Sequence, residues 1–250
     1  MINDPRSLCL CFLLGVIPPA MGQDLVGGGI AVAPWYPGAD SYRILPVPIV
    51  NFQRGPFFIS NSQGLPGVGL KMNVAPDLSV GVRLGMGLGR KEKRSERLEG
   101  LGDIDRHAQY GVFAEWKPGR WSASISYTQA AKSGYGGTLS ARGSYAIWQE
   151  GRHNVQVGAG LEWGNSDHMQ TWFGVTPEQS ARSGAGLPAY RPSSGLRSGV
   201  AFASWSYRMT ERWRVISLIG VQTLVGDAAD SPIVERKTAG FGSVGLTYSF

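Results

Sequence analysis

The three histidines of the chain, His107, His153 and His168, are the first candidates for catalysis, and only Asp167-His168 sets a carboxylate beside an imidazole. A carboxylate that orients an imidazole is the basis of general-base catalysis on a serine. Neighbouring residues of a strand point to opposite faces, so this pair would need a loop geometry to cooperate. The chain has no G-x-S-x-G motif and no convincing nucleophile–base spacing. We therefore expect no catalytic residue, and a solvated loop pair at 167–168.

Two other polar clusters could bind ions. Asp103 and Asp105 in GLGDID offer carboxylates to a cation, but the run lacks the ligand count of a calcium loop, so we expect aspartates that cap their own turn. RKEKRSER, residues 90–97, holds five basic and two acidic residues. On an outward-facing loop these cations could bind lipopolysaccharide phosphates, and a solvated loop explains them equally well. We expect neither a metal nor a cofactor.

The N-terminus, MINDPRSLCLCFLLGVIPPAMGQDL, predicts export. Arg6 precedes an apolar run over residues 8–17, and Ala20 and Gly22 are small residues before a cleavage point at Gln23. This is the pattern of a secretory signal peptide over 1–22, which leaves 23–250 as the mature chain. Both cysteines lie within that leader, so the mature chain would have none for disulfides, thiol catalysis or metal binding.

The rest of the chain alternates apolar with small or polar residues. Glycine accounts for 36 of 250 residues, charged residues for 17%, and no apolar run reaches the length of a membrane helix. In LSVGVRLGMGLG, residues 78–89, the apolar side chains fall on one face and Ser, Gly and Arg on the other. A strand this long is unusual in a soluble sandwich, and it suits a tilted strand that spans a membrane.

The same alternation predicts twelve strands, over 26–33, 42–53, 57–61, 68–74, 78–89, 105–116, 121–127, 138–148, 155–163, 197–208, 212–223 and 238–250. Every second connection is short, and those between are mostly longer. Short periplasmic turns and long outer loops are typical of outer-membrane barrels, with both termini in the periplasm. We expect an all-β protein, a transmembrane antiparallel up-and-down β-barrel of about 12 strands. Ten or fourteen are the alternatives, because the first three segments are weak.

Six charged side chains are predicted to face the lumen of this barrel: Arg43, Lys71, Arg83, Glu115, Arg142 and Glu162. Basic residues outnumber acidic ones among them, so an open lumen would favour anions. A charge network that fills a narrow barrel explains the same residues.

The longest irregular segment is FGVTPEQSARSGAGLPAYRPSSGL, residues 173–196, between the ninth and tenth strands. Loops of this length are usually functional or disordered. The segment has no histidine and one acidic residue, Glu178, so catalysis is disfavoured. Its aromatic residues and prolines predict an ordered lid or plug at the outer mouth: Phe173, Pro177, Pro188, Tyr190 and Pro192.

The chain ends in GLTYSF, with Tyr248 and Phe250 on one face of the last strand. A terminal phenylalanine on an alternating strand resembles the signal read by the outer-membrane assembly machinery. Other tryptophans and tyrosines lie near predicted strand ends, where an interfacial aromatic girdle would place them.

Several stretches resemble the MltA-interacting protein (MipA)/OmpV family of outer-membrane proteins. They are YPGADSYRILPVPIVNF (36–52), GLGDID (100–105), the 173–196 segment, GDAADSPIVERKTAGFG (226–242) and the closing YSF. One departure concerns the local loop: the usual S-G-L-P-x-Y of the family is SGAGLPAY here.

The resemblance implies a non-enzymatic barrel in the cell outer membrane of a Gram-negative bacterium, in contact with lipid and lipopolysaccharide. It also implies a scaffold that links two periplasmic partners, a lytic murein transglycosylase and a murein synthase. A narrow channel or transporter for small solutes is the alternative hypothesis. A barrel enzyme similar to outer-membrane phospholipase A is a third, and it lacks an outward-facing Ser–His pair. The compartment excludes nucleic acid as a partner.

Overall fold

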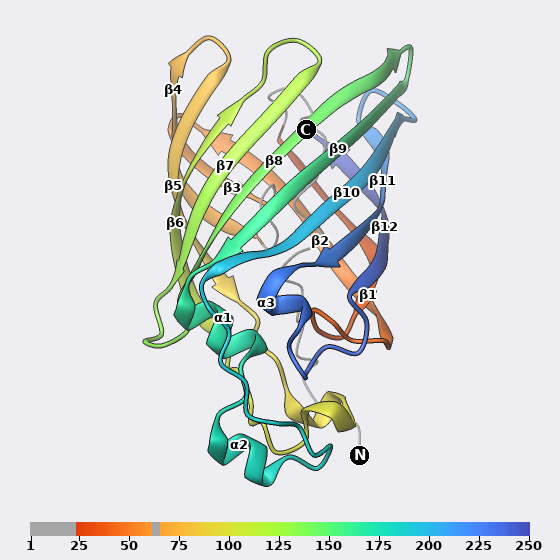
Figure 1. The fold of residues 1–250 in the computed structure, drawn as a ribbon. Helices are drawn as coiled ribbons and strands as arrows, with labels where there is room; N and C mark the ends of the chain where they lie inside the picture. Colours follow the sequence, from red (N-terminus) through yellow and green to blue (C-terminus); the bar gives the residue numbers. More distant parts are fainter. Residues whose placement is uncertain (1–23, 62–65) are drawn as a thin grey trace, which may run out of the picture.

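The computed structural model describes residues 24–61 and 66–250, so the predicted signal peptide and its two cysteines lie outside the described residues. Antiparallel strands pair in chain order and β1 pairs with β12, which closes the sheet into a barrel of twelve strands (Figure 1). The predicted fold class and strand number are confirmed. The strands are β1 (Leu25–Pro34), β2 (Tyr42–Arg54), β3 (Phe57–Ser60), β4 (Gly67–Ala75), β5 (Leu78–Gly87), β6 (His107–Trp116), β7 (Trp121–Ala130), β8 (Gly137–Glu150), β9 (His153–Gly164), β10 (Gly195–Arg208), β11 (Trp213–Leu224) and β12 (Thr238–Ser249).

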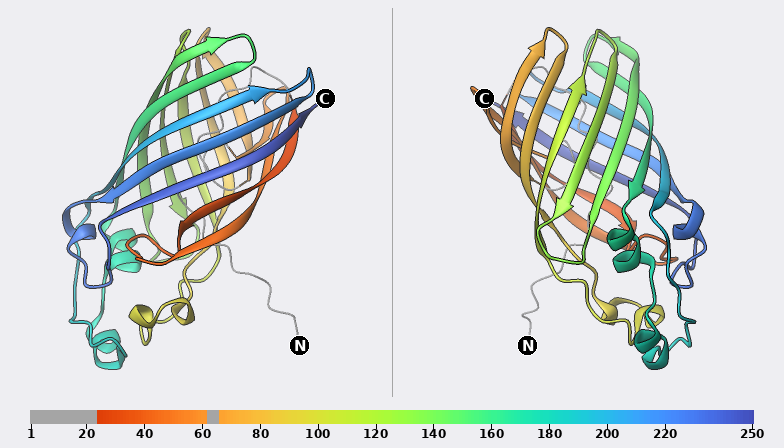
Figure 2. Two further views of the ribbon diagram at one scale, coloured as in Figure 1. Left: turned by 90° about the vertical axis from the view of Figure 1, so that its right-hand side faces the viewer. Right: turned by 60° about the vertical axis from the view of Figure 1, so that its left-hand side comes forward.

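The two ends of the barrel differ in their connections. The turns after β2, β4, β6, β8 and β10 are two to four residues long and lie at one end with the C-terminus (Figure 1). The longer connections lie at the other end and carry the helices of the described residues (Figure 2). These are η1 (Glu92–Arg94), η2 (Glu96–Leu98), α1 (Ser166–Phe173), α2 (Pro177–Arg182) and α3 (Gly226–Ala229). By this asymmetry the short-turn end faces the periplasm.

None of these helices is long and apolar enough to cross a membrane, within the part of the chain that the structure describes.

The outer face of the sheet is apolar, as lipid contact requires. On β4 and β5 the outward side chains of Val68, Met72 and Leu84 are 48%, 63% and 61% exposed. Their inward neighbours are glycines, Lys71, Asn73 and Arg83, which gives the period of two expected of a strand with lipid on one side. Exposed aromatic residues lie at the strand ends, where they can meet the membrane–water interface: Trp116, Trp121, Trp148 and Trp213 toward the short turns, and Tyr42 and Trp163 toward the long loops.

The inner face is divided into an apolar and a polar half. On β2 and β11 most of the buried inward side chains are aliphatic, including Leu45, Val47 and Leu218. On β7, β8 and β9 they are mostly small or polar residues: Ser, Thr, Gly, Gln, Arg and Glu. Polar inward groups are therefore densest on the β7–β9 side of the lumen.

Strand β2 is an edge over its outer half, and its sequence is adapted to that. Its pairing with β3 is confined to residues 51–54, although its pairing with β1 begins at Tyr42. Pro46 and Pro48 lack the N–H that an interior strand would donate, and prolines are tolerated on strand edges. The Asn61 side chain accepts from the Val50 N–H at 2.7 Å and donates to the Pro48 carbonyl at 3.1 Å, so it replaces a strand partner there.

The long loops build a folded cap over the outer mouth. We define the cap as residues 35–41, 88–106, 131–136, 165–194 and 225–237. One apolar cluster lies next to the strand ends and joins Ile104, Met169, Phe173, Leu224 and Ala228. A second cluster joins four loops: Tyr36, Leu98, Leu101, Val175, Leu187 and Ile233. Because each cluster draws on loops far apart in sequence, the cap is a packed unit with its own core.

Candidate functional site: a polar chamber under the cap

A cavity of about 100 Å³ lies inside the barrel beneath the cap, and we call it the chamber. Its wall is the polar inner face of β5–β9. Its roof is α1, which contributes His168 and Trp172, together with Tyr135 from the loop between β7 and β8. The chamber is thus formed jointly by the barrel wall and the cap.

Hydroxyl groups form a ladder on the wall of the chamber. Thr128 lies opposite Thr138 and Ser126 lies opposite Ser140, on the facing inner sides of β7 and β8. Directly opposed residues bring their Cβ atoms to about 4.5–5.5 Å, so the hydroxyls form a continuous strip. Ser124 continues the strip and lies opposite Arg142.

Arg142 and Arg83 are the two guanidinium groups of the chamber, and glycines make room for both. A Cβ on Gly160 would lie 2.8 Å from Arg142 Cγ, and a Cβ on Gly67 would lie 2.8 Å from the Arg83 Nη2 atom. Arg142 has no hydrogen bond or ion pair with any residue of the described chain. The small residues of the neighbouring strands are therefore part of the site.

Both carboxylates of the chamber have cationic partners of their own. Glu115 pairs with Lys117 at 2.7 Å. Glu162 accepts from the Ser140 hydroxyl at 3.1 Å and forms an ion pair with Arg197, whose side chain is fully buried. Each carboxylate therefore has an ion-pair partner other than Arg142.

Arg197 was missing from the predicted lumen charges, and a β-bulge explains why. Strict alternation along β10 puts Ser198 inside and Arg197 outside. The register between β9 and β10 shifts between Leu196 and Ser198, which turns the extra residue, Arg197, inward. The residue that could have pointed to Arg197 is Glu162 on the neighbouring strand β9, because a buried carboxylate needs a cation.

The roof residue His168 has an unsatisfied nitrogen. Its backbone N–H donates to the Asn165 side chain, which also accepts from the Gly137 N–H and so fixes α1 to the start of β8. Its Nε2 atom is buried and has no hydrogen-bond partner in the described chain. Burial holds the pKa of His168 well below its ordinary value, and the positive charge of Arg197 acts in the same direction. The imidazole is therefore neutral at pH 7.

The structure brings four of the six predicted lumen charges to the chamber: Arg83, Glu115, Arg142 and Glu162. The other two lie elsewhere. Arg43 is buried at the outer end of β2, with its guanidinium carbon 5.2 Å from the ring centroid of the cap residue Trp35. Lys71 is half-buried on the inner face of β4, outside the chamber lining.

The 173–196 segment forms a large part of the cap. Phe173 is fully buried in the cluster next to the strand ends, and Tyr190 packs on the second cluster. Pro177 is exposed and opens α2, whose Thr176 N-cap forms a reciprocal capping box with Gln179. Pro188 is exposed and Pro192 is buried. The role of the segment as a lid or plug stays a prediction.

Most cations of the charge run over 90–97 contact other cap residues. We had expected either a solvated loop or a loop that binds lipopolysaccharide. Arg90 is buried and donates to the Trp172 carbonyl at 3.0 Å. Arg97 donates twice to the Pro232 carbonyl, and the Arg94 guanidinium lies over the Trp35 ring at 5.1 Å. Only Lys93 among the cations of this run is exposed, so the run offers little to lipopolysaccharide phosphates.

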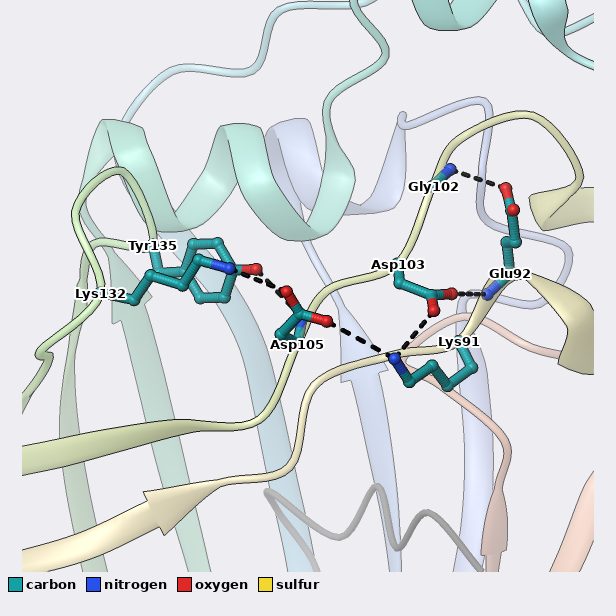
Figure 3. Close-up of polar contacts among 7 residues, drawn as sticks. All are labelled: Lys91, Glu92, Gly102, Asp103, Asp105, Lys132 and Tyr135. Atoms are coloured by element: carbon teal, nitrogen blue, oxygen red, sulfur yellow. Dashed lines mark hydrogen bonds and ion pairs between the residues drawn. The ribbon is translucent and has the colours of Figure 1, made fainter. Parts of the chain in front are cut away.

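Asp103 and Asp105 form ion pairs with lysines, beyond the turn capping that we expected (Figure 3). Lys91 lies 2.8 Å from Asp103 and 3.5 Å from Asp105, and Lys132 lies 2.9 Å from Asp105. The hydrogen bond from Lys91 holds the pKa of Asp103 below its ordinary value, and that from Lys132 does the same for the pKa of Asp105. This network ties the loop after β5 to the loop after β7.

The three histidines make different contacts, and His168 has no hydrogen bond or ion pair with its neighbour Asp167 in the described chain. Asp167 is exposed on α1, whereas His168 is buried, so the expected solvated pair is wrong for the histidine. His107 Nδ1 contacts the Asp105 carbonyl at 3.0 Å. His153 accepts from the Trp205 indole at 3.1 Å within an aromatic stack at the periplasmic end.

The C-terminal aromatic residues lie on the outer face at the periplasmic end. Phe250 is 71% exposed and packs near Tyr248 and Phe52, with ring centroids 5.4 and 5.9 Å away. Their role as an assembly signal stays a prediction.

A family model described as MltA-interacting protein MipA matches residues 26–250, which is nearly the whole described barrel. The chain belongs to the MipA family. MltA-interacting proteins of Escherichia coli (strain K12) and of Shigella flexneri are each 25% identical over 248 residues, covering 92% of this chain and 92% of theirs. With a closed barrel and an apolar outer belt, this MipA-family chain is an outer-membrane protein.

Solved structures similar to this MipA-family barrel include an outer membrane channel from Pseudomonas putida F1, which is 10% identical with full coverage of both chains and a TM-score of 0.49. The KdgM porin is 9% identical, covers 90% of this chain and 99% of its own, and has a TM-score of 0.49.

Proposed function

We propose that this barrel is a non-enzymatic scaffold that holds a lytic murein transglycosylase, and through it a murein synthase, at the periplasmic face of the outer membrane. The observation that carries the proposal is the match to the MltA-interacting proteins over 92% of both chains. That name states an interaction with MltA for the relative, and we extend it to this chain.

The periplasmic rim is the surface we assign to the partner. The packed cap occupies the opposite end, so a periplasmic protein meets the five short turns. Three exposed arginines stand on separate turns, Arg120, Arg152 and Arg212, with Glu211 beside the last of them. A standard interface needs about 800 Å² from each partner, so the transglycosylase must contact several turns together.

Charge reversal at the rim tests this scaffold. The triple variant Arg120→Glu, Arg152→Glu and Arg212→Glu should weaken binding of an MltA-type transglycosylase at least tenfold, because paired charges across an interface steer and hold the partner. The measurement is biolayer interferometry on the barrel in nanodiscs.

The matched control carries the same three charge changes on the cap, at Arg182, Arg191 and Arg236, which are exposed at the other end. It should bind like the unmodified barrel. If the rim variant binds the transglycosylase as tightly as the unmodified barrel does, the rim is not the interface. If the unmodified barrel does not bind the transglycosylase, the scaffold proposal is wrong.

A narrow channel for small solutes is the second candidate, favoured by the polar inner face of β7–β9. The cap opposes it, because two apolar clusters lie across the loops of the outer mouth. Single-protein conductance in planar bilayers separates the two: steady conductance of the intact barrel would favour the channel.

A further inference from the structure

We propose that the chamber is a binding site for a small hydroxylated carboxylate, with Arg142 binding the carboxylate and the Ser/Thr ladder binding the hydroxyls. The site does not depend on which protein the periplasmic rim holds. It requires only the barrel wall and the roof formed by α1.

The charge of the ligand follows from the ion pairs of the wall. Glu115 is paired with Lys117 and Glu162 with Arg197, so neither carboxylate is available to Arg142 as a close partner. A guanidinium without a hydrogen bond to the described chain, facing a cavity, is suited to the two oxygens of a carboxylate. A single negative charge on the ligand complements Arg142, which has no hydrogen bond or ion pair of its own in the described chain.

The hydroxyl groups of the ligand follow from the ladder. Ser124, Ser126, Thr128 and Thr138 line the chamber, and their hydroxyls have no partner among the described residues. A hydroxyl can donate and accept, so this strip matches other hydroxyls better than it matches an acceptor-only anion.

The roof adds a second group in need of a partner. His168 is 8% exposed, lines the chamber, and keeps a buried Nε2 without a hydrogen bond. Unsatisfied buried polar groups are uncommon in native proteins and call for a specific explanation, such as a bound molecule. A ligand hydroxyl at the outer end of the ladder supplies that partner.

The size of the chamber limits the ligand. About 100 Å³ is well below the roughly 300–1,000 Å³ of pockets for drug-sized molecules. A three-carbon hydroxy acid of the glycerate type is therefore the scale of molecule we assign, rather than an oligosaccharide.

Three ligands that share a three-carbon skeleton test the role of the charge and the role of the hydroxyls separately. In saturation-transfer NMR titrations of the barrel in nanodiscs, D-glycerate should bind saturably. Glycerol lacks the charge and propanoate lacks the hydroxyls, and each should bind at least tenfold more weakly. Equal binding of glycerol would overturn the role of the charge, and equal binding of propanoate would overturn the role of the ladder. Tighter binding of inorganic phosphate would overturn the assignment to a carboxylate.

Variants locate the binding inside the chamber. Arg142→Gln and the double variant Ser126→Ala, Thr128→Val should each raise the Kd for glycerate at least tenfold, whereas Arg182→Gln on the exposed α2 should leave it unchanged. Heat-modifiable migration in gels checks that every variant is a folded barrel. If folded Arg142→Gln binds glycerate as the unmodified protein does, or if the unmodified protein binds none, the chamber is not this site.

Discussion

Arg197 and Glu162 form a buried ion pair at the outer end of the barrel wall, so removing one partner leaves the charge of the other buried. Replacing Arg197 by Met leaves Glu162 buried, with the Ser140 hydroxyl as its remaining hydrogen-bond partner in the described chain. An uncompensated buried charge of this kind costs about 3–5 kcal/mol. Urea unfolding in detergent should therefore show a large loss of stability for Arg197→Met.

The double variant Arg197→Met, Glu162→Gln is the control. Because it removes both charges, it should recover most of the stability that the single change loses. A double variant as unstable as Arg197→Met would mean that the arginine acts through its packing on Phe173, whose ring centroid lies 6.0 Å from the guanidinium carbon.

Single-residue roles were only partly predictable from the sequence. Period-two alternation placed Arg83 and Arg142 on the inner face, since a regular strand fixes which way each side chain points. It missed Arg197, because a bulge moves one residue to the other face without a sequence signature of its own. It also misjudged Arg90 and Arg97, because charge runs look solvated unless the loops that bury them are known.

Among the strands, paired glycine and phenylalanine positions set how closely the wall can pack. A Cβ on Gly158 would lie 2.4 Å from the Phe202 ring on β10 and 2.6 Å from the Gly143 carbonyl on β8. Gly158→Ala should therefore destabilise the barrel by about 1–3 kcal/mol through overpacking. Gly143→Ala is the matched control, since nothing lies within 4 Å of its Cβ. Equal urea midpoints for the two variants would show that Phe202 moves freely out of the way.

Strands and cap helices differed in how well local sequence predicted them. The strands span the membrane and meet lipid on one face, so their alternation is imposed along the whole element and is visible in the sequence. The helices of the cap are short, and α2 has only six residues. Isolated helices of this length are unstable in water, so packing in the cap stabilises them. For α2 a local signal was present, because Thr176 and Gln179 have the spacing of a capping box.

For the molecule as a whole, the hydrogen-bonded strand pairs of the barrel and the apolar core of the cap are separate sources of stability. β9 and β10 pair from Gly164 and Gly195 inward, and this pairing does not involve residues 180–191. The cap does depend on that segment: Leu187 is buried in it, the Tyr190 hydroxyl donates to the Asp227 carbonyl at 2.9 Å, and Tyr190 bridges to Val175.

Replacing Ser180–Arg191 by a short Gly/Ser linker should therefore leave a folded, heat-modifiable barrel whose cap is loosened. Limited proteolysis should cut the loop after β5 faster, because Leu98 and Leu101 lose their packing partner Leu187. Conductance in planar bilayers should rise as the outer mouth opens.

Tyr190→Phe, which removes only one hydrogen bond, should keep the cap closed. A deletion variant that fails to assemble would show that the cap is needed to close the barrel itself. One that assembles but keeps the protease resistance of the unmodified protein would show that the cap holds without this segment.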